Sequence, residues 1–293
     1  MTIKSTIRQP LLVHRDHRRT FVDNLYVYAV VSRRSKGVSI GINLNPDKVC
    51  NFDCVYCQVD RKTPPVVRDV DVPRLLQELE EMLDLVQSGQ LFEMERFRQT
   101  SPHLRRLNDI AFSGDGEPTT CPDFLQIVQA VADIKQRRGL GDVKLVLITN
   151  ASMFHRPSVR EALAVLDANN GEIWAKLEAG TEHYYQQVDR TTIPFQRILD
   201  NITASLIRPI VIQALFLRMH DLPPPAEELA AFCDRLNEII AAGGQIKLVQ
   251  VYTVARVPAE TWVTPLRDKE VDAIVELVRS RTGLAAEAFY GPG

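Results

Sequence analysis

An alternation of short apolar runs with amphipathic helical segments constrains the fold of this chain more than any other feature. The apolar runs are almost uninterrupted, which is typical of strands buried on both faces of a sheet. Six such units predict parallel strands joined by right-handed crossovers, as either a barrel or an open doubly wound sheet. The predicted strands are Val38–Leu44, Asp109–Ser113, Val143–Thr149, Glu172–Leu177, Ile210–Leu217 and Ile246–Tyr252.

Helical segments separate and follow these strands. In each of them apolar residues recur three and four positions apart, so one face of the helix can pack on a sheet. Gly283 is a plausible residue to end the last helix. The predicted helices are Val72–Val86, Phe124–Lys135, Val159–Asp167, Phe195–Leu206, Glu227–Ala241 and Lys269–Arg281.

The first 37 residues precede this alternation. We predict that residues 1–37 form an N-terminal extension, with a hairpin around Tyr26–Ser39, and that residues 38–293 form the core domain. The segment from Lys4 to Arg34 is locally basic, and it is either a solvated hairpin or a surface for a polyanionic substrate. Its arginines are Arg8, Arg15, Arg18, Arg19, Arg33 and Arg34.

Composition indicates a soluble globular protein without a strong overall charge. The 293 residues are 45% hydrophobic and 25% charged, and 35 Lys and Arg against 37 Asp and Glu give a formal net charge of −2. No overall basic field therefore indicates nucleic-acid binding. No apolar run approaches the roughly 20 residues that cross a bilayer, and the N-terminus lacks a signal-peptide core, so we expect a cytoplasmic protein without membrane contact.

Three of the five cysteines lie within eight residues, directly after the first predicted strand. Cys50, Cys54 and Cys57 are poor candidates for disulfides in a reducing compartment, and thiolates are the ligands that iron–sulfur clusters and zinc prefer. Three thiolates would leave one iron of a cubane cluster without a protein ligand. A structural zinc site needs four ligands, and the nearest other histidines and cysteine, His14, His17 and Cys121, are distant in the chain.

Polar motifs follow the next three predicted strands at the point where each ends. Gly114–Pro118 follows the second strand, Thr149–Asn150 closes the third, and Lys176 and Glu178 close the fourth, two residues apart and thus on one face of a strand. The ends of parallel strands converge on one rim of a barrel, where active sites are built. The positions of these motifs therefore favour the barrel over the open sheet.

The Cys-x3-Cys-x2-Cys spacing, with Tyr56 just before the last cysteine, is similar to the signature of the radical S-adenosylmethionine (SAM) superfamily. The resemblance implies an α/β fold, a partial (β/α)6 TIM-like barrel that here carries a short N-terminal hairpin extension. It also implies that Cys50, Cys54 and Cys57 bind a [4Fe–4S] cluster, whose fourth iron binds the methionyl group of SAM. Tyr56 would then lie beside the adenine.

The same resemblance assigns further SAM contacts. Gly114, Asp115, Gly116 and Glu117 are similar to the Gly-Gly-Glu-Pro motif that holds the methionyl ammonium, a group that can only donate hydrogen bonds. Asp115 stands where that motif usually has glycine, so either Asp115 or Glu117 could make the contact, and we favour Glu117. Three more residues are implied near the cofactor, with Glu178 at the ribose hydroxyls: Thr149, Asn150 and Glu178.

Lys176 and Arg256 are the candidates for a role in the reaction itself. Lys176 stands where many members of the superfamily have serine. A lysine inside a barrel must be paired, bind an anion or have a lowered pKa, so Lys176 could contact SAM, contact a substrate, or pair with Glu178 or Glu117. Arg256 belongs to a loop over the same rim, where it could contact substrate or pair with Glu260.

Three segments narrow the resemblance to the branch of wyosine-type tRNA-modifying enzymes and their uncharacterised relatives: Ile40–Leu44, Cys57–Arg61 and Arg256–Glu260. No cysteine precedes Cys50, which argues against a second cluster and against wyosine-type chemistry. The implied protein is an enzyme that reductively cleaves SAM to a 5′-deoxyadenosyl radical, which abstracts hydrogen from an unidentified substrate. An RNA base is one candidate substrate, and a flavodoxin- or ferredoxin-type protein would supply the low-potential electron.

Other functions fit the sequence as well. A non-catalytic iron–sulfur protein that transfers electrons or senses redox state would need the cysteines alone. A zinc-stabilised binding module would hold one metal ion with them. Within the enzyme hypothesis, a peptide or a small metabolite is an alternative to RNA.

Overall fold

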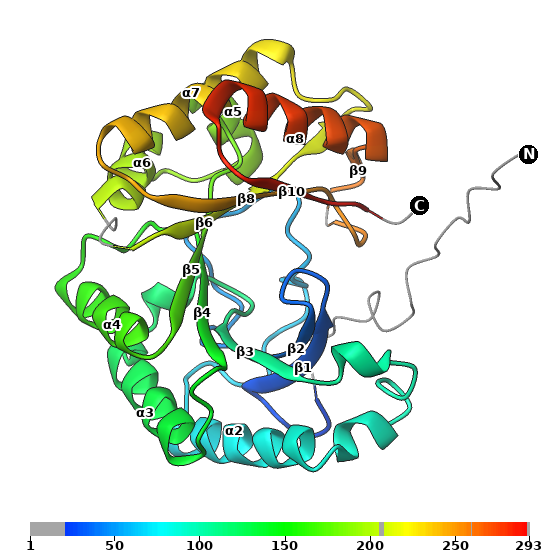
Figure 1. Cartoon of the computed structure of the whole chain (residues 1–293), viewed down its shortest axis with the longest axis vertical. Helices are drawn as coiled ribbons and strands as arrows, with labels where there is room; N and C mark the ends of the chain where they lie inside the picture. Colours follow the sequence, from blue (N-terminus) through cyan, green and yellow to red (C-terminus); the bar gives the residue numbers. More distant parts are fainter. Residues whose placement is uncertain (1–20, 205–207, 259, 292–293) are drawn as a thin grey trace, which may run out of the picture.

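The computed structural model describes residues 21–204, 208–258 and 260–291, in which eight strands form one curled sheet (Figure 1). Neighbouring strands are parallel, apart from the first pair, which is antiparallel. The sheet curls into a partial TIM-like barrel, so the predicted fold class is confirmed. In spatial order the strands are β1 (Val27–Ser32), β2 (Gly37–Ile42), β3 (Leu107–Phe112), β4 (Lys144–Thr149), β5 (Gly171–Lys176), β6 (Ile210–Leu215), β8 (Ile246–Tyr252) and β10 (Ala286–Phe289).

Helices cover the outer face of this sheet, and their apolar faces form the main core with it (Figure 1). The first begins where the Asp71 side chain accepts a hydrogen bond from the Arg74 amide, and the last ends at Gly283 in the left-handed conformation, as predicted. None of the described helices is long and apolar enough to cross a membrane. The helices are α2 (Val72–Gln87), α3 (Phe124–Arg137), α4 (Pro157–Ala168), α5 (Glu182–Asp189), α6 (Phe195–Ala204), α7 (Ala226–Ala241) and α8 (Asp268–Thr282).

The six predicted strands and six predicted helices are all present, and the additional elements are short. The predicted hairpin is formed by β1 and β2, which pair from Val27 with Ile42 to Ser32 with Gly37. Sequence periodicity missed α5 and β10, because eight and four residues are too few to show a period. It also missed the ribbon of β7 (Leu217–Met219) and β9 (Val263–Pro265), and the 3-10 turns η1 (Gln90–Glu93), η2 (Pro102–Leu104) and η3 (Pro118–Thr120).

The hairpin lies at one open edge of the sheet and β10 at the other, and the gap between these two edges is the seam of the partial barrel. The turn between β1 and β2 bridges this seam, since Arg33 Nη1 donates to the Tyr290 carbonyl at 3.0 Å and Lys36 lies 3.9 Å from Glu287. Of the basic N-terminal segment, Arg8, Arg15, Arg18 and Arg19 lie outside the described residues. The division between an extension and a core at residue 37 stays a prediction.

A second, smaller apolar cluster lies inside the barrel. It consists of Ala111, Val146, Trp174 and Val211, from four neighbouring strands. These side chains line part of the lumen with apolar surface. The polar residues of the strand ends meet nearer to the carboxyl ends of the strands.

Candidate active site

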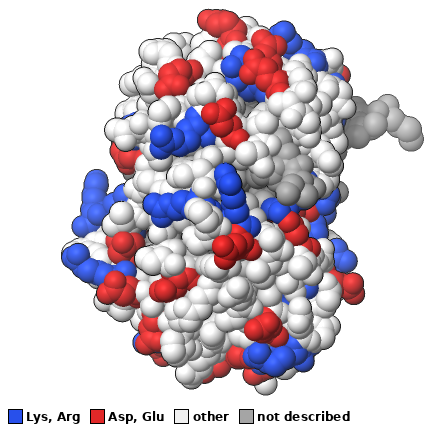
Figure 2. Space-filling model, turned by 90° about the vertical axis from the view of Figure 1, so that its left-hand side faces the viewer, with Lys and Arg blue, Asp and Glu red and all other residues white. Residues whose placement is uncertain are grey.

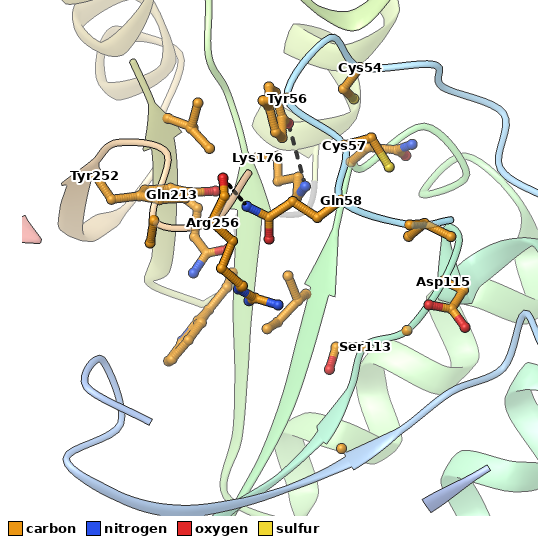
Figure 3. Close-up of a pocket in the computed structure, with 18 of the residues that line it drawn as sticks. Cys54, Tyr56, Cys57, Gln58, Ser113, Asp115, Lys176, Gln213, Tyr252 and Arg256 are labelled. Atoms are coloured by element: carbon orange, nitrogen blue, oxygen red, sulfur yellow. Dashed lines mark hydrogen bonds between the residues drawn. The ribbon is translucent and has the colours of Figure 1, made fainter. Parts of the chain in front are cut away.

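A cavity of about 300 Å³ occupies the lumen and extends from the β1–β2 turn to the loops that follow the strands (Figure 3). Its size is that of a site for a small molecule. Glu178 does not line it. All other residues predicted for the site do: Cys50, Cys54, Tyr56, Cys57, Gly114, Asp115, Gly116, Glu117, Thr149, Asn150, Lys176 and Arg256.

The loop after β2 that carries Cys50, Cys54 and Cys57, called the cysteine loop below, packs against the end of α5. The Asp53 amide donates to the Asp189 carbonyl at 3.1 Å and the Val55 amide to the Val188 carbonyl at 2.8 Å. Phe52 packs edge-on against Tyr185, with 5.9 Å between ring centroids. These contacts fix the loop so that its three cysteines, which are free thiols, border the cavity.

Two glycines let the loop after β3 pack against the cysteine loop. A Cβ atom on Gly114 would lie 2.1 Å from the Asn43 side-chain oxygen, and one on Gly116 would lie 2.2 Å from the Val49 carbonyl. Between them Asp115 exchanges two hydrogen bonds with Asn43, at 2.9 and 3.0 Å. Only glycine permits this close approach, which brings the two predicted motifs into one site.

Glu117 joins the ends of β3 and β4. Its buried carboxylate accepts hydrogen bonds from the Thr119 amide and hydroxyl at 3.1 and 2.5 Å, from the Thr149 hydroxyl at 2.6 Å and from the Asn150 amide at 2.7 Å. Burial raises its pKa, and these hydrogen bonds act in the opposite direction. The carboxylate oxygens are thus occupied by the protein itself.

Asn150 connects the end of β4 to the cysteine loop. Its side-chain amide donates to Asn51 at 2.9 Å, and Asn51 in turn donates to the Ser152 hydroxyl at 2.7 Å. The Thr191 hydroxyl donates to the Asn51 carbonyl at 3.0 Å. Thr149 and Asn150 therefore border the cavity and also position the loop that carries the cysteines.

Tyr56 closes the wall next to Cys54 and Cys57 (Figure 3). Its hydroxyl donates to Glu178 at 2.5 Å. Lys176 Nζ lies 3.4 Å from the Tyr56 hydroxyl oxygen and 5.2 Å from the centroid of the Tyr56 ring. Glu178 is 3% exposed and lies behind Tyr56. Because β5 ends at Lys176, the strand alternation that would place Glu178 on the cavity face does not continue to it.

Lys176 is a cation in this environment. Burial lowers its pKa, but the charge of Glu178 together with those of Tyr252, Cys54 and Cys57 raises it more, so that the pKa lies above its ordinary value. Burial and the neighbouring Glu178 raise the pKa of Asp189 well above its usual range, and burial also raises the pKa of Glu178. Glu178 and Lys176 thus approach the Tyr56 hydroxyl from two sides, and the charge of each favours the charged form of the other.

The rim is completed by the loop after β8. Gln58 Nε2 donates to the Arg256 carbonyl at 3.1 Å, and the exposed Arg256 side chain borders the cavity (Figure 3). Glu260 pairs with Arg190, which also lies 3.6 Å from Asp53 of the cysteine loop. The loop after β8 is therefore tied to the cysteine loop at two points.

The donor set suits a cluster of several iron atoms. Among the described residues, no three His, Cys, Asp or Glu side chains are placed to hold one metal ion. A structural zinc site needs four ligands at about 2.0–2.3 Å from a single ion. A [4Fe–4S] cluster instead presents separate iron atoms to separate thiolates, as three cysteines spread along one loop require.

Several lining residues were not predicted from the sequence. Arg34, Trp174, Gln213 and Tyr252 border the cavity from the turn after β1 and from β5, β6 and β8. Trp174 is two residues before Lys176, and strand alternation could have placed it on the same inward face. Asp189 lies in α5, which was itself not predicted.

The chain matches known proteins over most of its length. A family model described as "Radical SAM superfamily" matches residues 44–208, more than half of the chain. A "UPF0026 protein" of Helicobacter pylori is 24% identical over 220 residues, which cover 72% of this chain and 63% of that protein. The chain spans between 36% and 63% of the length of the curated relatives that it matches.

A solved structure shows the fold. SuiB of Streptococcus suis, solved with S-adenosylmethionine, has a TM-score of 0.56 and 13% identity, with 88% of this chain and 52% of SuiB covered. Archaeal TYW1 has a TM-score of 0.49 and 10% identity, with 83% and 72% covered. The family model and the UPF0026 relatives confirm the predicted recognition. The family model covers more than half of the chain, and the cysteine loop and the Gly114–Gly116 loop border one cavity of a partial barrel. This chain therefore belongs to the radical SAM superfamily.

Proposed function

We propose that this protein is an enzyme that binds a [4Fe–4S] cluster through Cys50, Cys54 and Cys57 and cleaves SAM reductively. One observation carries the proposal. The cysteine loop and the Gly114–Gly116 loop border the same cavity at the carboxyl ends of the strands, and glycine is required where they touch. When bound, the cluster would supply the electron that splits SAM into methionine and a 5′-deoxyadenosyl radical, which takes a hydrogen atom from the substrate.

The methionyl ammonium of SAM needs acceptors, because it can only donate hydrogen bonds. The Gly114–Gly116 backbone borders the cavity, and Asp115 adds a carboxylate there. Glu117 already accepts four hydrogen bonds from Thr119, Thr149 and Asn150. We therefore assign the ammonium to Asp115 and the neighbouring backbone carbonyls, and we assign Glu117 the task of holding this loop in place.

Tyr56 is placed for the adenine of SAM. Its ring borders the cavity between two cysteines and is held by Glu178 through its hydroxyl. Lys176 lies against the other side of that hydroxyl and keeps its charge. This arrangement leaves Lys176 available to the carboxylate of SAM or to an electron-rich group of the substrate, whereas Glu178 reaches the cofactor only through Tyr56.

An external electron donor fits the position of the cysteine loop. Cys50 borders both the cavity and a surface hollow that includes Lys48, Arg61 and Pro64. A flavodoxin- or ferredoxin-type protein docked on this hollow would come close to the cluster without entering the cavity. A non-catalytic electron carrier would use the same cysteines but would have no need of the cavity behind them.

Reconstitution tests the proposal. The full chain, loaded anaerobically with iron and sulfide, should turn brown and bind about four irons per chain. With dithionite and SAM it should then form 5′-deoxyadenosine. A loaded cluster that yields no 5′-deoxyadenosine would indicate the non-catalytic alternative, and a colourless protein holding one zinc ion would indicate the binding module.

A further inference from the structure

Two arginines approach the cavity from the end opposite to the cysteines. Arg33 and Arg34 lie in the turn between β1 and β2, and both border the cavity. The Arg34 guanidinium lies 5.0 Å from the ring centroid of Tyr252 and 5.7 Å from that of Trp174. The two rings flank the half-buried Arg34 where it borders the cavity.

Within the described ranges these two charges have no carboxylate counter-ion. Neither Arg33 nor Arg34 forms an ion pair there, and Arg33 donates to the backbone carbonyl of Tyr290. Burial and the charge of Arg34 lower the pKa of Arg33. The two carboxylates that border the cavity, Asp115 and Glu117, are at its cysteine end. An oxyanion between the arginines would relieve their repulsion and accept their N–H groups.

The surroundings of the pair are those of a small-molecule site. Trp174, Tyr252 and Phe289 supply aromatic walls, and Gln213, which is 1% exposed and hydrogen-bonded to Gln250 at 3.0 Å, supplies a fixed amide. Such a mixture of apolar walls with a few placed polar groups is typical of ligand pockets. The register puts Trp174 beside Val211 and Lys176 beside Gln213, so Lys176 is one level nearer to the cysteines than Trp174.

The geometry points to a small anionic substrate, a carboxylate or a phosphate monoester, whose charged end is bound by Arg33 and Arg34. This inference deepens the proposed function and rests on it, because the remainder of the molecule would then extend toward Lys176 and the SAM end of the cavity. A small molecule is favoured over RNA because the cavity that the arginines border has a volume of about 300 Å³, the size of a small-molecule site. The face over α3, α4 and α6 also mixes acidic with basic side chains instead of presenting a basic surface (Figure 2).

Trp174 can report binding directly. The chain has two tryptophans, and Trp262, which stacks on His220 outside the cavity lining, can be replaced by phenylalanine to leave Trp174 as the sole indole. We expect inorganic phosphate or acetate, titrated into the full-length Trp262→Phe protein at constant ionic strength, to change Trp174 fluorescence in a saturable way. Saturation with phosphate but not acetate would identify a phosphate ester, and the reverse a carboxylate.

Arg34→Gln in the same background should raise the half-saturating anion concentration about tenfold. This is the loss of affinity expected when charge-assisted hydrogen bonds to one anion are removed. Lys36→Gln is the matched control: Lys36 lies in the same turn but is exposed, pairs with Glu287 and does not border the cavity, so its titration should match that of the parent. Arg33→Gln serves as the second variant if Arg34→Gln unfolds at a lower temperature.

Three results would overturn the inference: no saturable change with either anion, equal affinity in both arginine variants and the parent, or an Arg34-dependent change caused by bulk tRNA but by neither small anion. The titration needs neither cluster nor SAM. Anion binding without 5′-deoxyadenosine formation would therefore refute the proposed function alone, whereas 5′-deoxyadenosine formation without anion binding would refute this inference alone.

Discussion

The two ends of the barrel lumen are built in different ways. At the cysteine end, consecutive residues in the loops after β2 and β3 supply thiols, glycines and short polar side chains. At the hairpin end, single long side chains converge from the β1–β2 turn, β5 and β8, as Arg34, Trp174 and Tyr252 show. The first end is a set of local motifs, and the second exists only after the sheet has curled.

This difference separates the tasks that we assign to the two ends. A cofactor that many proteins share can be bound by backbone and by a few residues at fixed spacing, and such a site is visible in a sequence. A substrate particular to one protein is bound by side chains that the fold brings together from distant segments. Substitutions at the two ends should therefore have separable effects.

The largest effect should come from Cys54. Cys54→Ala removes a thiolate that no neighbour can replace, so we expect the cluster content to fall. The formation of 5′-deoxyadenosine should drop by more than about 100-fold, which exceeds the loss typical of substitutions at residues that only contact a metal ligand. Iron analysis and product chromatography measure both. Cys121→Ala is the control, because Cys121 is buried away from the cavity lining and should leave both values unchanged. A Cys54→Ala protein that still forms product would end the cluster assignment.

Gly116→Ala should break the contact between the two loops. The added Cβ would lie 2.2 Å from the Val49 carbonyl, a backbone atom that cannot rotate away. Overpacking of this kind costs about 3 kcal/mol, which urea unfolding would measure as a lower free energy of unfolding. Gly141→Ala adds the same methyl group where no atom lies within 4 Å, and it should be neutral. Equal stability of the two variants would contradict the close approach.

At the hairpin end, Asp109 should make stability depend on pH. Burial raises its pKa to about 6, although it accepts a hydrogen bond from the Ser39 hydroxyl at 2.5 Å. The folded state thus keeps a proton that the unfolded chain releases at lower pH, so this group's contribution to stability falls as pH rises. Between about pH 4.5 and 7 the loss is about 2 kcal/mol.

Asp109→Asn cannot titrate, so its stability relative to the parent should improve by that amount over the same interval, as measured by urea unfolding at both pH values. A constant difference between the two proteins would show that Asp109 keeps an ordinary pKa. A pH dependence seen equally in both would come from other groups.

The smallest effect should come from Tyr28, which lies between the two ends. Its ring fits because Gly41 has no Cβ, and its hydroxyl lies 3.1 Å from the Ser113 carbonyl and 3.0 Å from the Ser113 hydroxyl. Tyr28→Phe should cost about 1 kcal/mol of unfolding free energy. Tyr184→Phe is the comparison: that buried hydroxyl has no partner in the described part of the chain, so its removal should cost nothing. A larger loss for Tyr184 would reverse this ranking.

Much of the fold could be predicted because its elements carry long local patterns. Apolar runs marked every strand from β2 to β6 and β8, and helical spacing marked α2, α3, α4, α6, α7 and α8. The choice between a barrel and an open sheet was not local, since periodicity is the same in both. The elements α5 and β10 were missed because they are short, although α5 supplies Asp189 behind the cysteine loop.

The candidate site divides in the same way. Sequence motifs predicted most of the residues that border the cysteine end of the cavity, but they could not predict which contacts each of these residues makes. Glu117 was favoured for the ammonium, and in the structure its oxygens are taken by Thr119, Thr149 and Asn150. Glu178 was expected on the cavity face, and it lies behind Tyr56 because β5 has ended. Hydrogen-bond partners from other loops decide such details, and spacing alone carries no information about them.

The sequence by itself determined the family, the α/β class and the three cysteines, since a ligand set at fixed spacing and a repeated apolar pattern are properties of contiguous residues. Only the tertiary structure decided that Arg33 and Arg34, which in the sequence are two charges in a basic segment, border the cavity, and that Arg34 lies against Trp174 and Tyr252. The physical reason is that the curled sheet brings the β1–β2 turn to the seam beside β10, where burial beside aromatic rings replaces solvation of the charge.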